Sequence, residues 1–223
     1  MSEAVKSPDM GSYGKEVCLM MLREDVTSDD INKFLFSKFE TDPEGVIDDC
    51  VAMIAVSGLC MSFLVSVINS ASDKNILDKI VASCTDRLPV CDANNRRDLV
   101  FLIEWAKARC DELILPVELE SLGTAFRLTS SGDCPNLAVI RHIRDRIGEV
   151  RVETDGVRSR QDSLLRAYQD DELGSEQQRL DNLAMEDPLA AMRAYRQLVR
   201  PGAPLANFYR TGLVVPNCLV RSE

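Results

Sequence analysis

The sequence predicts an all-α protein: a multi-helix bundle around one buried apolar helix at about residues 43–69, followed by a helical C-terminal subdomain and an apolar tail. Three observations support this prediction. Apolar residues recur at spacings of three and four along most of the chain, strand-like alternation is nearly absent, and residues 50–68 carry no charged side chain. The pattern fits roughly eight to ten helices.

The chain is expected to divide into four parts. With 223 residues, 45% of them hydrophobic, it is long enough to bury a substantial core. The parts are a flexible arm (1–14), an N-terminal helical bundle (15–123), a C-terminal helical part (124–186) and an Arg-rich helix with a docking tail (187–223). We find no internal repeat and no sustained heptad pattern.

The N-terminal bundle begins with a short helix predicted at 15–22. The sequence Thr27-Ser28-Asp29-Asp30 is then a capping signature for a second helix. Asp42, Pro43 and Glu44 form the start signal of the central helix, since they supply a cap, a suitable first residue and a charge that complements the helix dipole.

The uncharged run at 50–68 fits either a buried helix or a membrane span of about 20 residues. Asp48 and Asp49 precede it, and no Trp or Tyr lies near either end. A membrane span usually has aromatic residues at its ends and a clear excess of cations on one side. We therefore favour burial in protein over a membrane span.

Two further helices complete the predicted bundle. One is capped by Ser72 or Asp73 and ends at Leu88-Pro89. The other covers 96–114, is stopped by Pro116 and places Trp105 in the core. Residues 116–134 are less regular, with a short strand or loop at 125–128, and mark the boundary to the C-terminal part.

The C-terminal part is predicted to hold several shorter helices. Pro135 opens one, Gly148 weakens it, and the polar segment 153–163 is expected to be a hinge or exposed loop. Asp187-Pro188 starts a helix that Pro201-Gly202 ends. The apolar tail that follows is expected to dock on the body or on a neighbouring subunit through Phe208, Tyr209, Leu213 and Val214.

The chain lacks the usual signatures of catalysis and metal binding. It has one histidine, His142, no CxxC pair and no phosphate-binding Gly-rich loop. Cys134 and His142 would lie too far apart along a helix to form a nucleophile pair. We predict no enzyme activity, no metal, no cofactor and no small-molecule substrate. Of the eight cysteines, Cys50, Cys60, Cys84 and Cys110 fall in apolar helical patterns, which indicates reduced thiols and an intracellular protein, cytoplasmic or nuclear.

Charge is distributed unevenly along the chain. The net charge is −10, yet residues 188–222 hold five Arg and no acidic residue. Arg193, Arg196 and Arg200 share one helical face and Arg210 extends the cationic surface. A secondary basic cluster, in which acidic residues are interleaved, contains Arg141, Arg144, Arg146 and Arg151.

These features predict a non-enzymatic, self-assembling structural or scaffold protein that forms homo-oligomers. The acidic N-terminal half and the Arg-rich end would be its interaction surfaces. By analogy of general character, it resembles a viral matrix, coat or nucleocapsid-like subunit. Alternatively, the C-terminal arginines bind nucleic acid, including RNA, or an anionic membrane.

Overall fold

The computed structural model describes residues 10–23, 25–131 and 136–219. Over these ranges the chain forms ten α-helices, one 3-10 turn and no strand, which confirms the all-α prediction. The helices are α1 (Ser12–Met21), α2 (Ser28–Phe39), α3 (Pro43–Ser57), α4 (Met61–Ser70), α5 (Lys74–Arg87), α6 (Ala93–Ser130), α7 (Leu137–Gln169), α8 (Glu172–Glu186), α9 (Pro188–Leu198) and α10 (Ala206–Thr211), followed by η1 (Asn217–Leu219).

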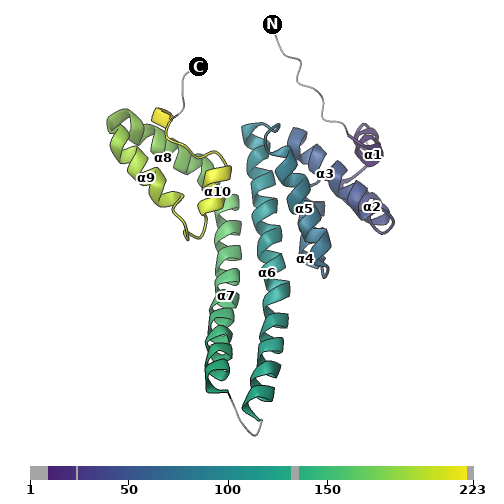
Figure 1. The fold of residues 1–223 in the computed structure, drawn as a ribbon. Helices are drawn as coiled ribbons and strands as arrows, with labels where there is room; N and C mark the ends of the chain where they lie inside the picture. The colour runs from purple at the N-terminus through teal and green to yellow at the C-terminus, as the bar shows by residue number, and fades with distance from the viewer. Residues whose placement is uncertain (1–9, 24, 132–135, 220–223) are drawn as a thin grey trace.

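Two long antiparallel helices, α6 and α7, form the centre of the molecule (Figure 1). Helices α1–α5 lie on the α6 side, and α8–α10 lie at the end of α7 near the start of α6. The half of the hairpin that leads to the α6–α7 connection extends beyond both groups of helices (Figure 1). We call this half, residues 111–131 and 136–153, the projecting hairpin.

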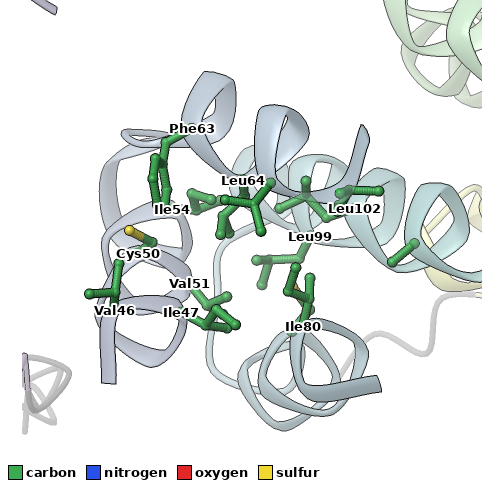
Figure 2. Close-up of a cluster of buried hydrophobic side chains, with 14 of the residues drawn as sticks. Val46, Ile47, Cys50, Val51, Ile54, Phe63, Leu64, Ile80, Leu99 and Leu102 are labelled. Carbon is green, nitrogen blue, oxygen red and sulfur yellow. The ribbon is translucent and has the colours of Figure 1, made fainter. Parts of the chain in front are cut away.

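The first core lies between α3, α4, α5 and the first half of α6 (Figure 2). Its side chains are fully or almost fully buried and include Val46, Ile47, Val51, Ile54, Phe63, Leu64, Ile80, Leu99 and Leu102. Burying one such side chain stabilises the fold by about 1.5–3 kcal/mol. The prediction that the uncharged run packs inside the protein is therefore correct for most of its large apolar side chains, although Val56 is 51% exposed.

The predicted single helix at 43–69 is wrong in one respect, because it is two helices. Gly58 ends α3 in the left-handed conformation with φ 68°, and its N–H bonds the Ile54 carbonyl oxygen. Cys60 follows with φ 71° and begins α4. Glycine adopts this conformation without steric cost, so the chain can turn there and pack α4 against α3. Along the described chain, no helix combines the length and apolar character needed to cross a membrane.

The segment 1–14, predicted to be a flexible arm, is helical in its last residues. Residues 1–9 of it lie outside the described residues, but Ser12–Gly14 form the first turn of α1. The buried carboxylate of Asp49 accepts hydrogen bonds from the N–H groups of Gly11 at 2.6 Å, Tyr13 at 2.9 Å and Gly14 at 3.0 Å. A negative charge at a helix N-terminus is favourable, so Asp49 fixes α1 to α3.

Helix α6 continues through Pro116 to Ser130. This corrects the predicted stop at Pro116 and, as far as Ser130, the predicted irregular segment at 116–134. Residues 125–128 are helical rather than a strand or loop. A proline inside a helix costs about 3 kcal/mol. Packing of α7 along α6 compensates, since Ala108 and Leu115 are buried against Val150 and Val157 of α7. The predicted domain boundary at 123/124 thus falls within a continuous helix.

Helix α7 is also continuous, so the hinge predicted at 153–163 is wrong. Its start at Pro135 lies outside the described residues, and the Asn136 side chain caps the helix. Four buried residues, Ile143, Val150, Val157 and Leu164, are spaced by seven. This is the heptad spacing of a helix that faces one partner along its length, and the sequence prediction missed it.

The apolar tail packs against its own chain in a second core. Phe208, Tyr209 and Val214 are buried with residues of α6, α7 and α8, whereas Leu213 is 42% exposed. Tyr209 Oη donates to Glu172 at 2.7 Å. Of the four tail residues predicted to dock, three do so within the molecule.

Candidate interaction surfaces

Helix α9 carries the arginine face predicted from the sequence. The Asp187 side chain caps α9 by accepting from the N–H groups of Leu189 at 3.0 Å and Ala190 at 3.1 Å. Ala191 is the buried contact of this helix, and the side away from it is solvated. Arg193, Arg196 and Arg200, which we call the arginine face, are all exposed.

None of the three residues of the arginine face has a carboxylate partner among the residues that the structure describes. Other described arginines, such as Arg141, Arg151 and Arg210, share this property. The paired ones include Arg97 with Asp171, Arg109 with Glu112, Arg160 with Asp111 and Arg179 with Glu176. An unpaired guanidinium can bind a carboxylate or a phosphate through two parallel hydrogen bonds. The arginine face is therefore available to an external anionic group.

Arg210 extends outward from α10. The helix is held by Phe208 and Tyr209, which are buried, and Arg210 is exposed beside them. Its guanidinium donates to Asn207 Oδ1 at 2.8 Å, a contact that leaves its charge uncompensated. Arg210 thus adds a cation to the surface of the C-terminal part.

The secondary basic cluster divides into two kinds of residue. Arg146 bonds Glu118 of α6 at 2.9 Å, Glu149 at 3.1 Å and Glu153 at 3.0 Å, and these hydrogen bonds raise its pKa above the ordinary arginine value. It therefore links α7 to α6. Arg141, Arg144 and Arg151 are exposed, and Arg144 lies 3.7 Å from Asp145.

Exposed carboxylates on the N-terminal helices complement the arginine face in charge. Glu16 of α1, Glu40 at the end of α2, Glu44 of α3 and Asp86 of α5 are exposed and make no ion pair within the described ranges. We use the name acidic face for these four residues, which come from four different helices of the N-terminal half. It belongs to helices on the α6 side of the hairpin, whereas α9 lies on the α7 side (Figure 1).

A polar cluster joins the start of α6 to the end of α7. Tyr168 Oη donates to Asp98 at 2.8 Å, and the Arg97 guanidinium lies 5.2 Å from the centre of the Tyr168 ring. Burial raises the pKa of Asp98, and burial together with the hydrogen bond to Asp98 raises the pKa of Tyr168 to about 12. The cluster holds the hairpin together and has a structural role.

Trp105 occupies the position expected of a core anchor. It is half-buried, packs against both large cores and stacks on Phe101 with ring centres 5.5 Å apart. Its indole Nε1 donates to Asn69 Oδ1 at 2.9 Å. One ring face of Trp105 and its indole donor are thus used within the protein.

No candidate metal site is found among the described residues. They contain no group of three or more His, Cys, Asp or Glu side chains placed to hold a metal ion. Seven cysteines are unpaired thiols, and burial raises the pKa of Cys84 to about 12. His142 is exposed, and Cys134 lies outside the described residues.

Sequence reasoning missed one further surface. On the projecting hairpin, the side of α6 away from α7 carries Ile114, Val117, Ser121, Thr124 and Leu128, which we call the α6 stripe, and all five are exposed. The spacing of three and four was present in the sequence. The prediction missed it because a proline such as Pro116 usually ends a helix.

These features define an all-α protein built on a helical hairpin, with an unpaired arginine face on one side and an acidic face on the other. Comparison with known proteins gives no closer relation: no protein-family model, no curated protein and no solved structure matches this chain.

Proposed function

We propose that this chain is a non-enzymatic subunit of a protein assembly, in which the arginine face of one copy binds the acidic face of the next. The observation that supports this most is that Arg193, Arg196 and Arg200 are exposed and make no ion pair with another described residue. Structural subunits of the viral matrix, coat or nucleocapsid type assemble through such repeated contacts, which is an analogy of class alone.

The positions of the two faces determine the kind of assembly. They lie on different parts of the molecule, so the contact is head-to-tail and repeats into a ring or an open filament. One exposed ion pair contributes about 0–1 kcal/mol. Several pairs acting together are therefore needed, and salt should weaken the contact because exposed charges are screened.

The test is light scattering coupled to size exclusion, over a range of protein and salt concentrations. The triple variant R193E/R196E/R200E reverses the arginine face and should lower the assembly size, as should raising the salt. The control variant R141E/R144E/R151E makes the same change in net charge at exposed positions of α7. A wild-type chain that stays monomeric throughout, or an equal effect of both variants, would rule out the proposal.

Point variants are preferable to removal of residues 188–223. Phe208 and Val214 are buried against α6 and α8, so a truncated chain would expose Val100 and Leu180. Exposed apolar surface itself promotes association. A truncation would therefore confuse loss of an interface with damage to the second core.

The alternative is that the arginine face binds phosphates of RNA or of an anionic membrane. Guanidinium groups suit phosphate as well as carboxylate, and binding to phosphates should weaken steeply with salt. Fluorescence anisotropy with single-stranded RNA and cosedimentation with phosphatidylserine vesicles, both at low salt, separate these ligands. Binding that R193E/R196E/R200E abolishes and R141E/R144E/R151E retains would favour this alternative over self-assembly.

A further inference from the structure

One face of α6 continues from the first core onto the projecting hairpin. In the first half of the helix this face includes Leu99, Ile103 and Ala106, which are buried in the first core. Continuing at helical spacing, it becomes the α6 stripe. There the exposed fractions reach 41% at Ile114, 64% at Val117 and 72% at Leu128. The same face is thus covered along half of the helix and uncovered along the rest.

The central residues of the α6 stripe have a spacing that reads the same in both directions. Val117, Ser121, Thr124 and Leu128 are separated by four, three and four residues. Large apolar residues lie at the two ends and small hydroxyl residues at the centre. Reversing the helix direction therefore superimposes large on large and small on small, and the small residues allow two helices to approach closely.

The charged residues beside the stripe also match when one of two copies of the helix is reversed. Glu120 and Arg127 are spaced by seven, so they lie on one side of the stripe, and both are exposed. Neither has an ion pair with another described residue; Arg127 donates only to Thr124 Oγ1 at 3.2 Å. Suppose that a second copy of α6 packs antiparallel, with the centres of the two stripes opposite each other. Arg127 of the second copy then lies about 3 Å along the helix axis from Glu120 of the first.

We propose that the α6 stripe is a two-fold interface on which a second copy of this chain packs antiparallel, with Glu120 of each subunit paired with the partner's Arg127. Such an isologous contact uses one patch twice, as the reversible spacing requires. A parallel arrangement would bring two copies of α3–α5 into the same space, because these helices cover the first half of the same face. An antiparallel copy places them beyond the opposite end of the hairpin.

A second copy fits this surface better than a lipid bilayer does. Glu120 lies beside the stripe and makes no ion pair with another described residue, so a hydrocarbon environment would bury its charge without a partner. The match between the stripe and its own reversed copy is the feature that selects this chain as its partner.

This two-fold contact does not depend on the arginine face, so it is tested in the R193E/R196E/R200E background and at high salt. Sedimentation velocity across protein concentration should show a monomer–dimer equilibrium. Replacing apolar residues of the stripe, in V117E or L128E, should remove the dimer. The control is V152E on α7, where the replaced side chain is 72% exposed and lies outside the stripe.

Charge exchange provides the second, more specific test, at low salt. E120R and R127E should each weaken the dimer by about 2–10-fold, since each brings like charges together at both symmetric pairs. The double variant E120R/R127E restores opposite charges and should recover most of the affinity. Circular dichroism confirms that each variant is folded.

Three outcomes would overturn the two-fold interface. They are a monomer at every concentration, a V152E effect equal to that of V117E, and a double variant no tighter than either single one. None of these outcomes bears on the head-to-tail contact, which is judged by the response of the otherwise unchanged chain to salt and to reversal of the arginine face.

Discussion

Asp49 is the residue on which the N-terminal end of the described fold most depends. It is a buried carboxylate, 7% exposed, and its partners are three backbone N–H groups rather than a cation. A Cβ atom at Gly11 would lie 2.5 Å from its Oδ1, so the close approach requires glycine there. The motif joins α1 to α3 through local geometry and charge together.

We predict that Asp49→Ala lowers the free energy of unfolding by about 2–3 kcal/mol. The variant leaves three N–H groups without their charged acceptor, and hydrogen bonds to charged groups contribute about 1.5–3 kcal/mol. Urea denaturation followed by circular dichroism measures the change. Asp78→Ala is the control, because the Asp78 side chain is 56% exposed and pairs with Lys74 at the surface.

The control should cost less than about 1 kcal/mol, as exposed ion pairs usually do. Equal effects of the two alanine variants would show that the N–H cluster at Asp49 has no special role. A wild-type-like Asp49→Ala would lead to the same conclusion.

At the scale of elements, α6 is the helix that connects the whole structure. Its first half contributes Leu99 and Leu102 to the first core, and Val100 and Phe101 to the second, while Ala108 and Leu115 pack against α7. Three different sides of one helix are thus buried by three different partners. Along the whole of such a helix the apolar residues are spread over several sides, so they form no single apolar face even though much of the helix is buried.

This explains which elements could be predicted from the sequence. The starts of α2, α3 and α9 were predicted at Thr27, Asp42 and Asp187, because a cap is a local contact between a side chain and nearby N–H groups. The unbroken courses of α6 and α7 were not, because packing between them outweighs the local preferences of Pro116 and Gly156.

The candidate surfaces, too, could be predicted where they depend on local sequence and not where they depend on packing. The exposure of the arginine face followed from the spacing of Arg193, Arg196 and Arg200 alone. Which arginines are paired did not, since Arg160 and Asp111 are far apart in sequence and meet only across the hairpin. The α6 stripe was missed because its existence depends on α6 continuing past Pro116.

We predict that Gly148→Ala and Gly156→Ala each raise the free energy of unfolding by about 0.5–1 kcal/mol. Both glycines lie inside α7, and a Cβ atom added at either one would meet no neighbouring atom within 4 Å, so alanine fits and favours the helix. Thermal and urea denaturation measure the gain, which should add in the double variant.

Gly58→Ala is the matched control, and it should destabilise by about 1–2 kcal/mol. Its φ of 68° is left-handed, a conformation that costs a residue with a Cβ atom. Destabilisation by the α7 variants would contradict the continuous helix and would favour a break near residues 148–156.

At the scale of the whole molecule, the two proposed contacts lie on different surfaces. The arginine face belongs to the end of the molecule at α8–α10, and the α6 stripe belongs to the projecting hairpin (Figure 1). A head-to-tail contact and a two-fold contact on one subunit can operate together. Together they would join subunits in more than one direction.

We therefore predict three size classes. R193E/R196E/R200E should leave only dimers, V117E/L128E should leave only salt-sensitive head-to-tail chains or rings, and the combined five-residue variant should be monomeric. Light scattering at matched concentrations distinguishes these classes. Assemblies of wild-type size in the combined variant would mean that a different surface holds the subunits together.

The docked tail also has a consequence for the order of folding during synthesis. The first core uses residues between Val17 and Ala106, so it can form as soon as the first half of α6 has been made. The second core joins Val100 to Phe208 and Val214 and cannot close until more than a hundred further residues have been added. The N-terminal helices should therefore fold on the ribosome first, before the second core covers the other side of α6.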